Sequence, residues 1–221
     1  KYKFVSSPFI FNIESNDIMI NEKPWPGKFN GSGTIIEFEC SEILFNTLQK
    51  GIRGFAGFDR CLDYLREEVG YIYAGVIQKG IGIINIQGEG GYSKPVEAVK
   101  PDWAGYYKPG SGNADIDLGV GNVKIEYQFG EMKESDYVKH YKRNMSTSGA
   151  EIRINGRLLM GNIFKQIWEI ENHPSFNHFL VMINLVSLDR DKLPKTRTSK
   201  NGIRSGDEKL EKLFEWIRKT H

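Results

Sequence analysis

Residues 178–203 read HFLVMINLVSLDRDKLPKTRTSKNGI, and this stretch decides the fold. Its first part is almost continuously apolar, which is typical of a strand that is buried on both faces of a sheet. Pro194 then restricts the path of the chain into a polar, basic connection. The Asn-Gly pair at 201–202 turns the chain, and Asp207 is the expected N-cap of a C-terminal helix. The stretch therefore predicts a buried strand, a loop and a closing helix.

The expected loop carries four cationic side chains, namely Lys195, Arg197, Lys200 and Arg204. Four interpretations compete: a solvated turn, a nucleic-acid contact, the flank of a nuclease site, and a sensor for a phosphate held in a neighbouring domain. Solvated charge is the default for such a loop. A lysine on a rigid loop also suits phosphate sensing, because it carries a point charge on a long stem.

Hydrophobic periodicity and turn residues predict a mixed α/β chain. The expected strands are two within 1–20, then 33–40, 71–77, 80–90, 122–132, a hairpin at 149–159, and 178–188. The expected helices are 41–52, 58–70 with Gly70 at its end, 162–168, and 207–220. Residues 91–120 are rich in Gly, Pro and Tyr, so we expect an irregular insertion there. The class is α/β or α+β, with a mixed sheet and helices packed on one face.

The composition excludes several classes of protein. The chain has 221 residues, 39% of them hydrophobic, and a formal net charge of +2, which is too small to argue for nucleic acid by itself. No run of about 18 apolar residues exists, so we expect no membrane span. The two cysteines, Cys40 and Cys61, have no partner at zinc-ligand spacing. We therefore expect buried thiols, no metal site, and a reducing cytoplasm.

One motif is typical of metal-dependent nucleases. A proline precedes Asp102, and Glu131-Met-Lys133 follows far downstream, as in the PD-(D/E)xK pattern. In such sites two carboxylates hold Mg²⁺, and the lysine polarises the attacking water. Asp115 and Asp117 would add oxygen ligands. The pattern requires the aspartate beside the Glu-x-Lys strand, whereas Asp102 falls in the segment expected to be irregular.

The four histidines show no convincing pairing with a nucleophile, and no Gly-x-Ser-x-Gly motif is present. His173 and His178 flank a short polar segment just before the buried strand. For these two residues we expect packing or capping roles rather than catalysis.

The order of four stretches resembles the GHKL ATPase superfamily, which includes gyrase, the ninety-kilodalton heat-shock chaperones, histidine kinases, MutL and MORC-like bacterial ATPases. The stretches are GTIIEFEC (33–40), FDRCLDYLREEVGYIYAGVIQKGIGIINIQG (58–88), GAEIRINGRLLMGNIFKQIW (149–168), and the opening one. The resemblance implies that residues 1–45 finish an ATP-binding domain. Residues 46–221 would form a transducer domain, with the ribosomal-protein-like left-handed βαβ fold and an insertion at about 91–120.

The resemblance also implies a function. A transducer ends a strand in a loop whose lysine reaches the γ-phosphate of ATP. Lys200 falls on that lysine, Lys195 remains the alternative, and Arg197 is a further nucleotide-binding candidate. The full-length protein would use ATP and Mg²⁺, whereas we expect this chain alone to bind neither and to be inactive. The motifs that bind adenine and magnesium are expected N-terminal to Lys1.

The implied partners are the upstream ATP-binding domain, a second copy of the chain in a homodimer, and DNA; no membrane is implied. Two alternatives of other classes stay open. One is the Mg²⁺-dependent nuclease built on Asp102, Glu131 and Lys133. The other is a DNA-binding module, whose affinity would fall steeply with salt.

Overall fold

The computed structural model describes residues 10–14, 17–21, 35–37, 42–50, 57–88, 91–105, 109–196, 203 and 206–220. The chain divides into two compact units, residues 1–50 and residues 51–221. Each unit has a sheet of its own, and the two units are described separately. No helix among the described residues is long and apolar enough to cross a membrane.

The first unit contains a small three-stranded sheet. Strand β1 (Ile10–Glu14) lies between β2 (Asp17–Asn21), to which it is antiparallel, and β3 (Ile35–Glu37), to which it is parallel. Helix α1 (Glu42–Lys50) follows. The two N-terminal strands, the third strand and the helix all lie within the segments for which the sequence pattern predicted them.

The second unit is organised around a five-stranded mixed sheet with the order β6-β7-β10-β8-β9. Its strands are β6 (Gly110–Asp117), β7 (Asn122–Glu131), β8 (Gly149–Ile154), β9 (Arg157–Ile163) and β10 (Phe179–Val186). The apolar strand β10 lies at the centre, parallel to β8 and antiparallel to β7. The expected mixed α/β class is confirmed.

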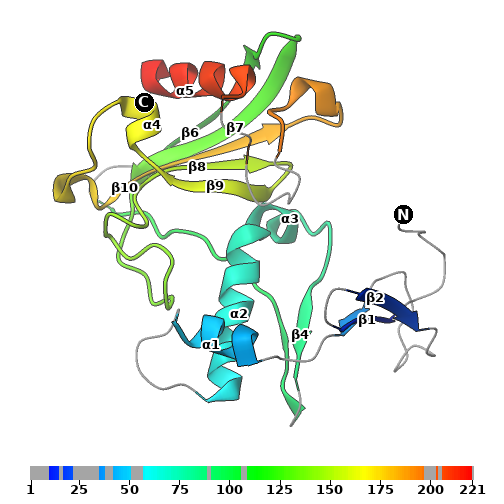
Figure 1. Cartoon of the computed structure of the whole chain (residues 1–221). Helices are drawn as coiled ribbons and strands as arrows, with labels where there is room; N and C mark the ends of the chain where they lie inside the picture. The colour runs from blue at the N-terminus through cyan, green and yellow to red at the C-terminus, as the bar shows by residue number, and fades with distance from the viewer. Residues whose placement is uncertain are drawn as a thin grey trace. The chain divides into compact units, whose positions relative to one another are not determined.

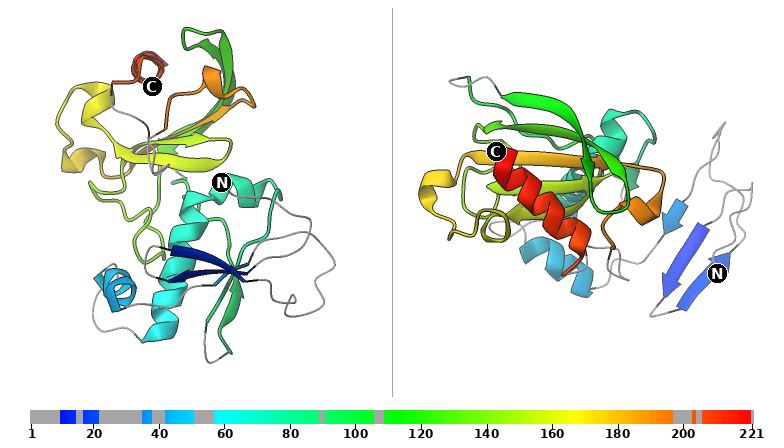
Figure 2. Two further views of the ribbon diagram at one scale, coloured as in Figure 1. Left: turned by 45° about the vertical axis from the view of Figure 1, so that its right-hand side comes forward. Right: turned by 90° about the horizontal axis from the view of Figure 1, so that it is seen from above.

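One face of this sheet forms the main hydrophobic core. Helix α5 (Glu208–Thr220) lies across the strands on this face (Figure 2). Its apolar stripe, Leu210, Leu213, Phe214 and Ile217, is buried as the helical spacing predicts. Helix α4 (Lys165–Trp168) contributes to the same core through Ile167. Asp207 accepts the N–H groups of Lys209 and Leu210, so it is the N-cap that the sequence predicted.

The other face of the sheet is covered by the C-terminal end of α2 (Phe58–Ile72), by α3 (Ala74–Gln78), and by the irregular segment 133–148 (Figure 1). Residues of β8 alternate between the two faces. Ile152 belongs to the core under α5, whereas Glu151 and Arg153 face α2. Helices therefore pack on both faces, not on the single face that the sequence predicted. The second face combines the buried charges with a smaller apolar cluster of Val99, Met132, Tyr141 and Leu180.

The expected strand pair at 71–77 and 80–90 was wrong. Helix α2 continues past Gly70 to Ile72, and α3 follows after Tyr73. Strand β4 (Asn85–Gln87) pairs instead with β5 (Ser93–Pro95). Gly70 does not end the helix. A Cβ atom there would lie 2.2 Å from the carbonyl oxygen of Glu97, so this glycine allows a second segment to approach the helix.

The expectation of an irregular insertion over 91–120 was wrong in part. The segment contains β5 and the whole of β6, whose sequence GSGNADID is poor in strand-forming residues. Strand β6 forms because β7 offers a continuous partner from Asn122 to Phe129. Two of its glycines face aromatic rings of β7: a Cβ at Gly110 would lie 2.3 Å from Phe129, and one at Gly112 would lie 2.5 Å from Tyr127. Tertiary pairing overrides local preference here.

Candidate functional site

A buried ion pair lies at the centre of the polar face. Glu151 and Arg153 are only 2% and 3% exposed, and Arg153 Nη2 donates to Glu151 Oε2 at 3.0 Å. The Tyr71 hydroxyl donates to Glu151 Oε1 at 2.7 Å, and the Tyr141 hydroxyl lies 3.4 Å from Oε2. Both carboxylate oxygens therefore have partners. We call these four residues the polar layer.

Arg153 also joins the sheet to the end of helix α2. Its Nη1 atom donates to the carbonyl oxygen of Tyr71 at 2.9 Å and lies 3.5 Å from that of Ile72. These carbonyls belong to the last turn of the helix, where no further helical N–H group can bind them. A cation at this end also interacts favourably with the helix dipole. Helix α2 thus ends on a charge supplied by β8.

Burial and charge shift the pKa values of the polar layer strongly. Burial, together with the neighbouring Glu151 carboxylate, raises the pKa of Tyr71 and of Tyr141 well above that of an ordinary tyrosine. Burial alone would lower the pKa of Arg153, but the pairing with Glu151 outweighs it and raises that pKa. Both tyrosines thus remain protonated donors, and Arg153 remains charged.

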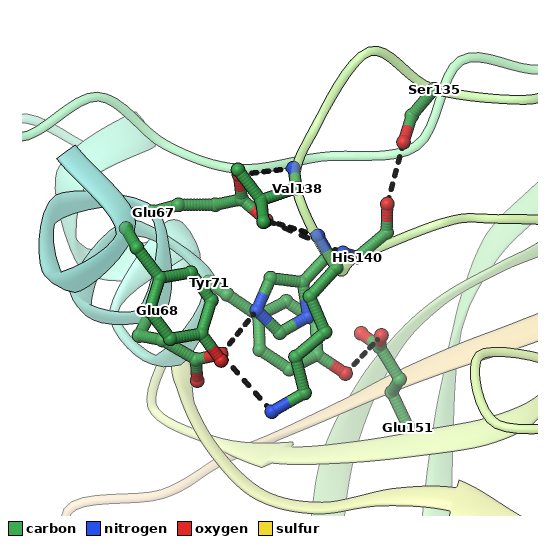
Figure 3. Close-up of polar contacts among 9 residues, drawn as sticks. Glu67, Glu68, Tyr71, Ser135, Val138, His140 and Glu151 are labelled. Atoms are coloured by element: carbon green, nitrogen blue, oxygen red, sulfur yellow. Dashed lines mark hydrogen bonds and ion pairs between the residues drawn. The ribbon is translucent and has the colours of Figure 1, made fainter. Parts of the chain in front are cut away.

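Two adjacent glutamates of α2 hold the segment 133–148 (Figure 3). The Glu67 carboxylate accepts the successive backbone N–H groups of Val138, Lys139 and His140 at 2.6, 2.9 and 3.3 Å. Glu68 Oε1 lies 3.1 Å from Lys139 Nζ and 3.3 Å from His140 Nε2. Helix α2 is therefore bound to this segment through backbone and side-chain groups alike.

His140 stacks on the ring of Tyr71, with 3.8 Å between ring centroids. The His140 ring therefore lies between Glu68 and Tyr71, and it connects Glu68 to the polar layer, as Figure 3 shows. No partner for His140 could be recognised along the chain, because Glu68 lies 72 positions away on another element. Tyr141 follows with φ at 57°, a left-handed conformation that is uncommon for a bulky residue, and its side chain is buried. Such strain persists only where the surroundings impose it.

The start of the β10–α5 connection is a second candidate region. Leu193 and Pro194 are buried, and Thr196 forms an antiparallel bridge with the buried Ile203. The Lys195 N–H group donates to Asp207 Oδ2 at 3.1 Å, while its side chain is exposed. Asp207 therefore joins the loop to the helix that it caps. Arg197, Lys200 and Arg204 lie outside the described residues.

An open pocket of about 470 Å³ lies beside Lys195. Lys209 and Lys212 of α5 also line it, together with the turn 118–120 between β6 and β7. Asp207 and Glu208 belong to the same lining, so the pocket carries both signs of charge. Three lysines, Lys195, Lys209 and Lys212, therefore lie around the pocket beside these two carboxylates.

The structure brings the two halves of the nuclease motif together. Trp103 and Met132 form an antiparallel bridge, and the Lys133 N–H group donates to the carbonyl oxygen of Asp102 at 2.7 Å. Paired residues of an antiparallel ladder carry their side chains on the same side, and so do residues two positions apart. Asp102, Glu131 and Lys133 therefore share one side. Asp102 does lie in an irregular stretch, as expected, but the backbone of that stretch pairs with the end of the Glu-x-Lys segment.

The chemistry around this motif is less favourable. Glu131 Oε1 lies 3.2 Å from Arg143 Nη2, an ion pair that competes with a metal for this carboxylate. Asp117, named as a further ligand, accepts the N–H groups of Gly119 and Gly121 and stabilises the β6–β7 turn. Among the residues that the structure describes, no three His, Cys, Asp or Glu side chains gather as a metal site would require.

Comparisons with protein families, with curated proteins and with solved structures found no match to this chain.

The Glu68 environment yields a pH-dependent prediction. Burial alone would raise the pKa of Glu68, but the contacts with His140 and Tyr64 outweigh it and lower the pKa from 4.5 to about 2. A carboxyl group with a lowered folded-state pKa stabilises the fold above its unfolded pKa, and this contribution is lost as the pH falls through the folded pKa. We expect Glu68→Gln to cost on the order of 2–3 kcal/mol above pH ~5. The difference should shrink between about pH 4.5 and 2.

Urea unfolding of both proteins across this pH range measures the effect. Glu215→Gln is the control, because Glu215 pairs with Lys219 on the exposed side of α5 and should show little effect. A Glu68→Gln deficit that stayed constant from pH 6 to pH 2 would contradict the assigned ionisation.

Proposed function

We propose that the chain is the transducer segment of a GHKL-type, MORC-like ATPase. In this role it couples ATP binding and hydrolysis in an upstream domain to a conformational change. The observation that most favours the proposal is the construction of the β10–α5 connection. The buried central strand leads into it, Leu193 and Ile203 anchor it in the core, and the Thr196–Ile203 bridge brings its two ends together.

This construction suits a phosphate sensor because both ends of the loop are fixed. A cation carried between fixed ends can be aimed at a phosphate with little loss of entropy on binding. Lys200 is the proposed sensor, with Lys195 as the alternative and Arg197 as a second nucleotide contact. ATP and its Mg²⁺ would be held mainly by the upstream domain, and this chain would supply the lysine.

The proposal also explains how a local event could become a larger motion. Hydrolysis removes the γ-phosphate and with it the partner of the lysine, so the loop is free to rearrange. Its start is continuous with β10, the central strand of the sheet, and its end with α5. A homodimer that opens and closes with this motion, and DNA held by it, are the partners that the proposal includes.

A second candidate function is favoured by one observation, the backbone pairing that sets Asp102 beside Lys133. In a PD-(D/E)xK nuclease, Asp102 and Glu131 would bind Mg²⁺ and Lys133 would assist the attacking water. This candidate predicts Mg²⁺-dependent DNA cleavage that is lost in Asp102→Ala or Glu131→Ala. The control is Asp59→Ala, because Asp59 is an exposed aspartate in the first turn of α2 and does not belong to the motif. No cleavage at any Mg²⁺ concentration would exclude it.

The main proposal is tested by Lys200→Ala in the ATPase that joins this segment to its ATP-binding domain. We expect ATP turnover to fall about a hundredfold or more, because a cation on the γ-phosphate acts where charge develops in the transition state. Stability should change by less than about 1 kcal/mol, since a loop lysine buries little surface. Steady-state ATP hydrolysis and thermal unfolding measure the two quantities.

Lys195→Ala and Arg204→Ala are the matched controls, because they remove the same charge from the same connection. An equal loss of turnover in all three variants would indicate a general electrostatic effect. A strong loss in Lys195→Ala alone would identify Lys195 as the sensor. If no variant changed turnover, the transducer proposal would be rejected.

A further inference from the structure

We infer that Asn155 is a positioning residue that ties the start of the β10–α5 connection to helix α3, so that the two move together. Asn155 and Gly156 form the turn between β8 and β9. On one side of this turn lies Ser187, the first residue after β10, and on the other lies Gly75 of α3. The coupling itself does not depend on the proposed function. Only the event that would move the loop, the loss of the γ-phosphate, rests on the proposed function.

The Asn155 side chain binds the backbone of Ser187 through two hydrogen bonds. Its Oδ1 atom accepts the Ser187 N–H group at 3.1 Å, and its Nδ2 atom donates to the Ser187 carbonyl at 2.8 Å. Regular pairing between β8 and β10 ends at Ile154 and Leu185, and a last backbone bond runs from the Asn155 N–H group to the Leu185 carbonyl. The backbone of Ser187 therefore has no strand partner in β8, and the Asn155 side chain takes the place of that partner. We call this pair of bonds the clasp.

The same turn is held against helix α3. The Gly75 N–H group donates to the carbonyl oxygen of Gly156 at 3.1 Å. A Cβ atom at Gly75 would lie 2.6 Å from Gly156 Cα, so the helix and the turn are in direct backbone contact. Gly156 has φ at 86°, and it tolerates this conformation because it lacks a side chain. The turn therefore cannot shift toward α3 without displacing it.

A second connection runs parallel to the first. The Gly156 N–H group donates to Asn184 Oδ1 at 2.8 Å, and Asn184 Nδ2 donates to Glu126 Oε2 at 2.8 Å. Lys79, just after α3, binds the same Glu126 oxygen at 2.9 Å. Strands β7 and β10, the turn and the end of α3 are thus joined by one chain of hydrogen bonds.

From Ser187 the ordered contacts continue into the connection. Ser187 Oγ accepts the Asp189 N–H group at 3.1 Å. Asp189 in turn caps the 3₁₀ turn η3 (Arg190–Lys192), because its Oδ1 atom accepts the N–H group of Asp191. The chain then reaches the buried Leu193 and the anchored N–H group of Lys195. Hydrogen bonds and buried residues therefore connect Lys195 to the clasp, so a displacement of Lys195 can reach Ser187.

The coupling can be tested in the chain itself, without nucleotide, by amide hydrogen exchange at Ser187 and at Gly75. Asn155→Gly removes the clasp and keeps a residue that accepts the φ of 50°. It should speed exchange at Ser187 about tenfold, as the loss of such bonds implies, and it should also speed exchange at Gly75. Gly75→Ala should speed exchange at Ser187, whereas Gly82→Ala, where a Cβ meets no atom within 4 Å, should not.

Lys79→Ala repeats the test without introducing a steric clash. Its matched control is Lys94→Ala, because Lys94 binds Asp63 at the same 2.9 Å with the same 44% side-chain exposure, away from the turn. We expect Lys79→Ala, but not Lys94→Ala, to speed exchange at Ser187. The coupling would be refuted if Asn155→Gly changed exchange at Ser187 but not at Gly75, and if neither Gly75→Ala nor Lys79→Ala changed exchange at Ser187.

A separate measurement tests the event that moves the loop. In the ATPase that contains this segment, exchange at Gly75 should differ between the ADP state and a state with a non-hydrolysable ATP analogue. Asn155→Gly should abolish that difference. The variants could show coupled exchange in the isolated chain while the nucleotide state has no effect on exchange at Gly75. That result would support the clasp and count against the proposed function.

Discussion

The buried pair of Glu151 and Arg153 is the constraint on which the arrangement of the second unit depends. Two charges removed from water are costly, and hydrogen bonds to further partners are needed to offset that cost. Arg153 Nε has no hydrogen-bond partner in the described part of the chain, so the offset rests on the remaining contacts. Here the partners come from outside the sheet: the Tyr71 hydroxyl, the Tyr141 hydroxyl, and the last carbonyls of α2. Helix α2 and the segment 133–148 must therefore take one position relative to β8.

The two faces of the sheet consequently differ in what they contribute. The face under α5 supplies apolar burial, which stabilises the fold but tolerates many packings. The face toward α2 and α3 has a smaller apolar cluster around Met132 and Leu180. It adds directed contacts from Glu67, Glu68, Arg153 and Asn184. We expect a displacement of the central strand β10 to reach α2 and α3 through these directed contacts. This asymmetry suits a domain that converts a local change at the β10–α5 connection into movement of helices.

The sequence predicted the elements whose signals are local. The apolar run of β10, the hairpin expected at 149–159, and the Asp207 cap with its apolar stripe are all found. The Asn-Gly turn expected at 201–202 lies outside the described residues. Elements set by distant contacts were missed. Gly70 was interpreted as a helix end because its contact with Glu97 is invisible along the chain, and β6 forms only because β7 pairs with it.

For the candidate site, the alternation of Glu151, Ile152 and Arg153 was a local sign of a strand with one polar face. The partners on α2 had no such sign, because they lie about 80 positions earlier in the chain. The Asp102–Lys133 pairing was missed for the same reason.

The most direct test of this account is a double-mutant cycle on the buried pair, followed by urea unfolding. Arg153→Met alone leaves the Glu151 carboxylate buried without its cation, and it should cost about 3–5 kcal/mol. Adding Glu151→Gln removes the stranded charge and keeps an acceptor for Tyr71, so the double variant should recover roughly half of that loss or more. Losses that simply added, or a cost below about 1 kcal/mol for Arg153→Met, would show that the pair does not determine the position of α2.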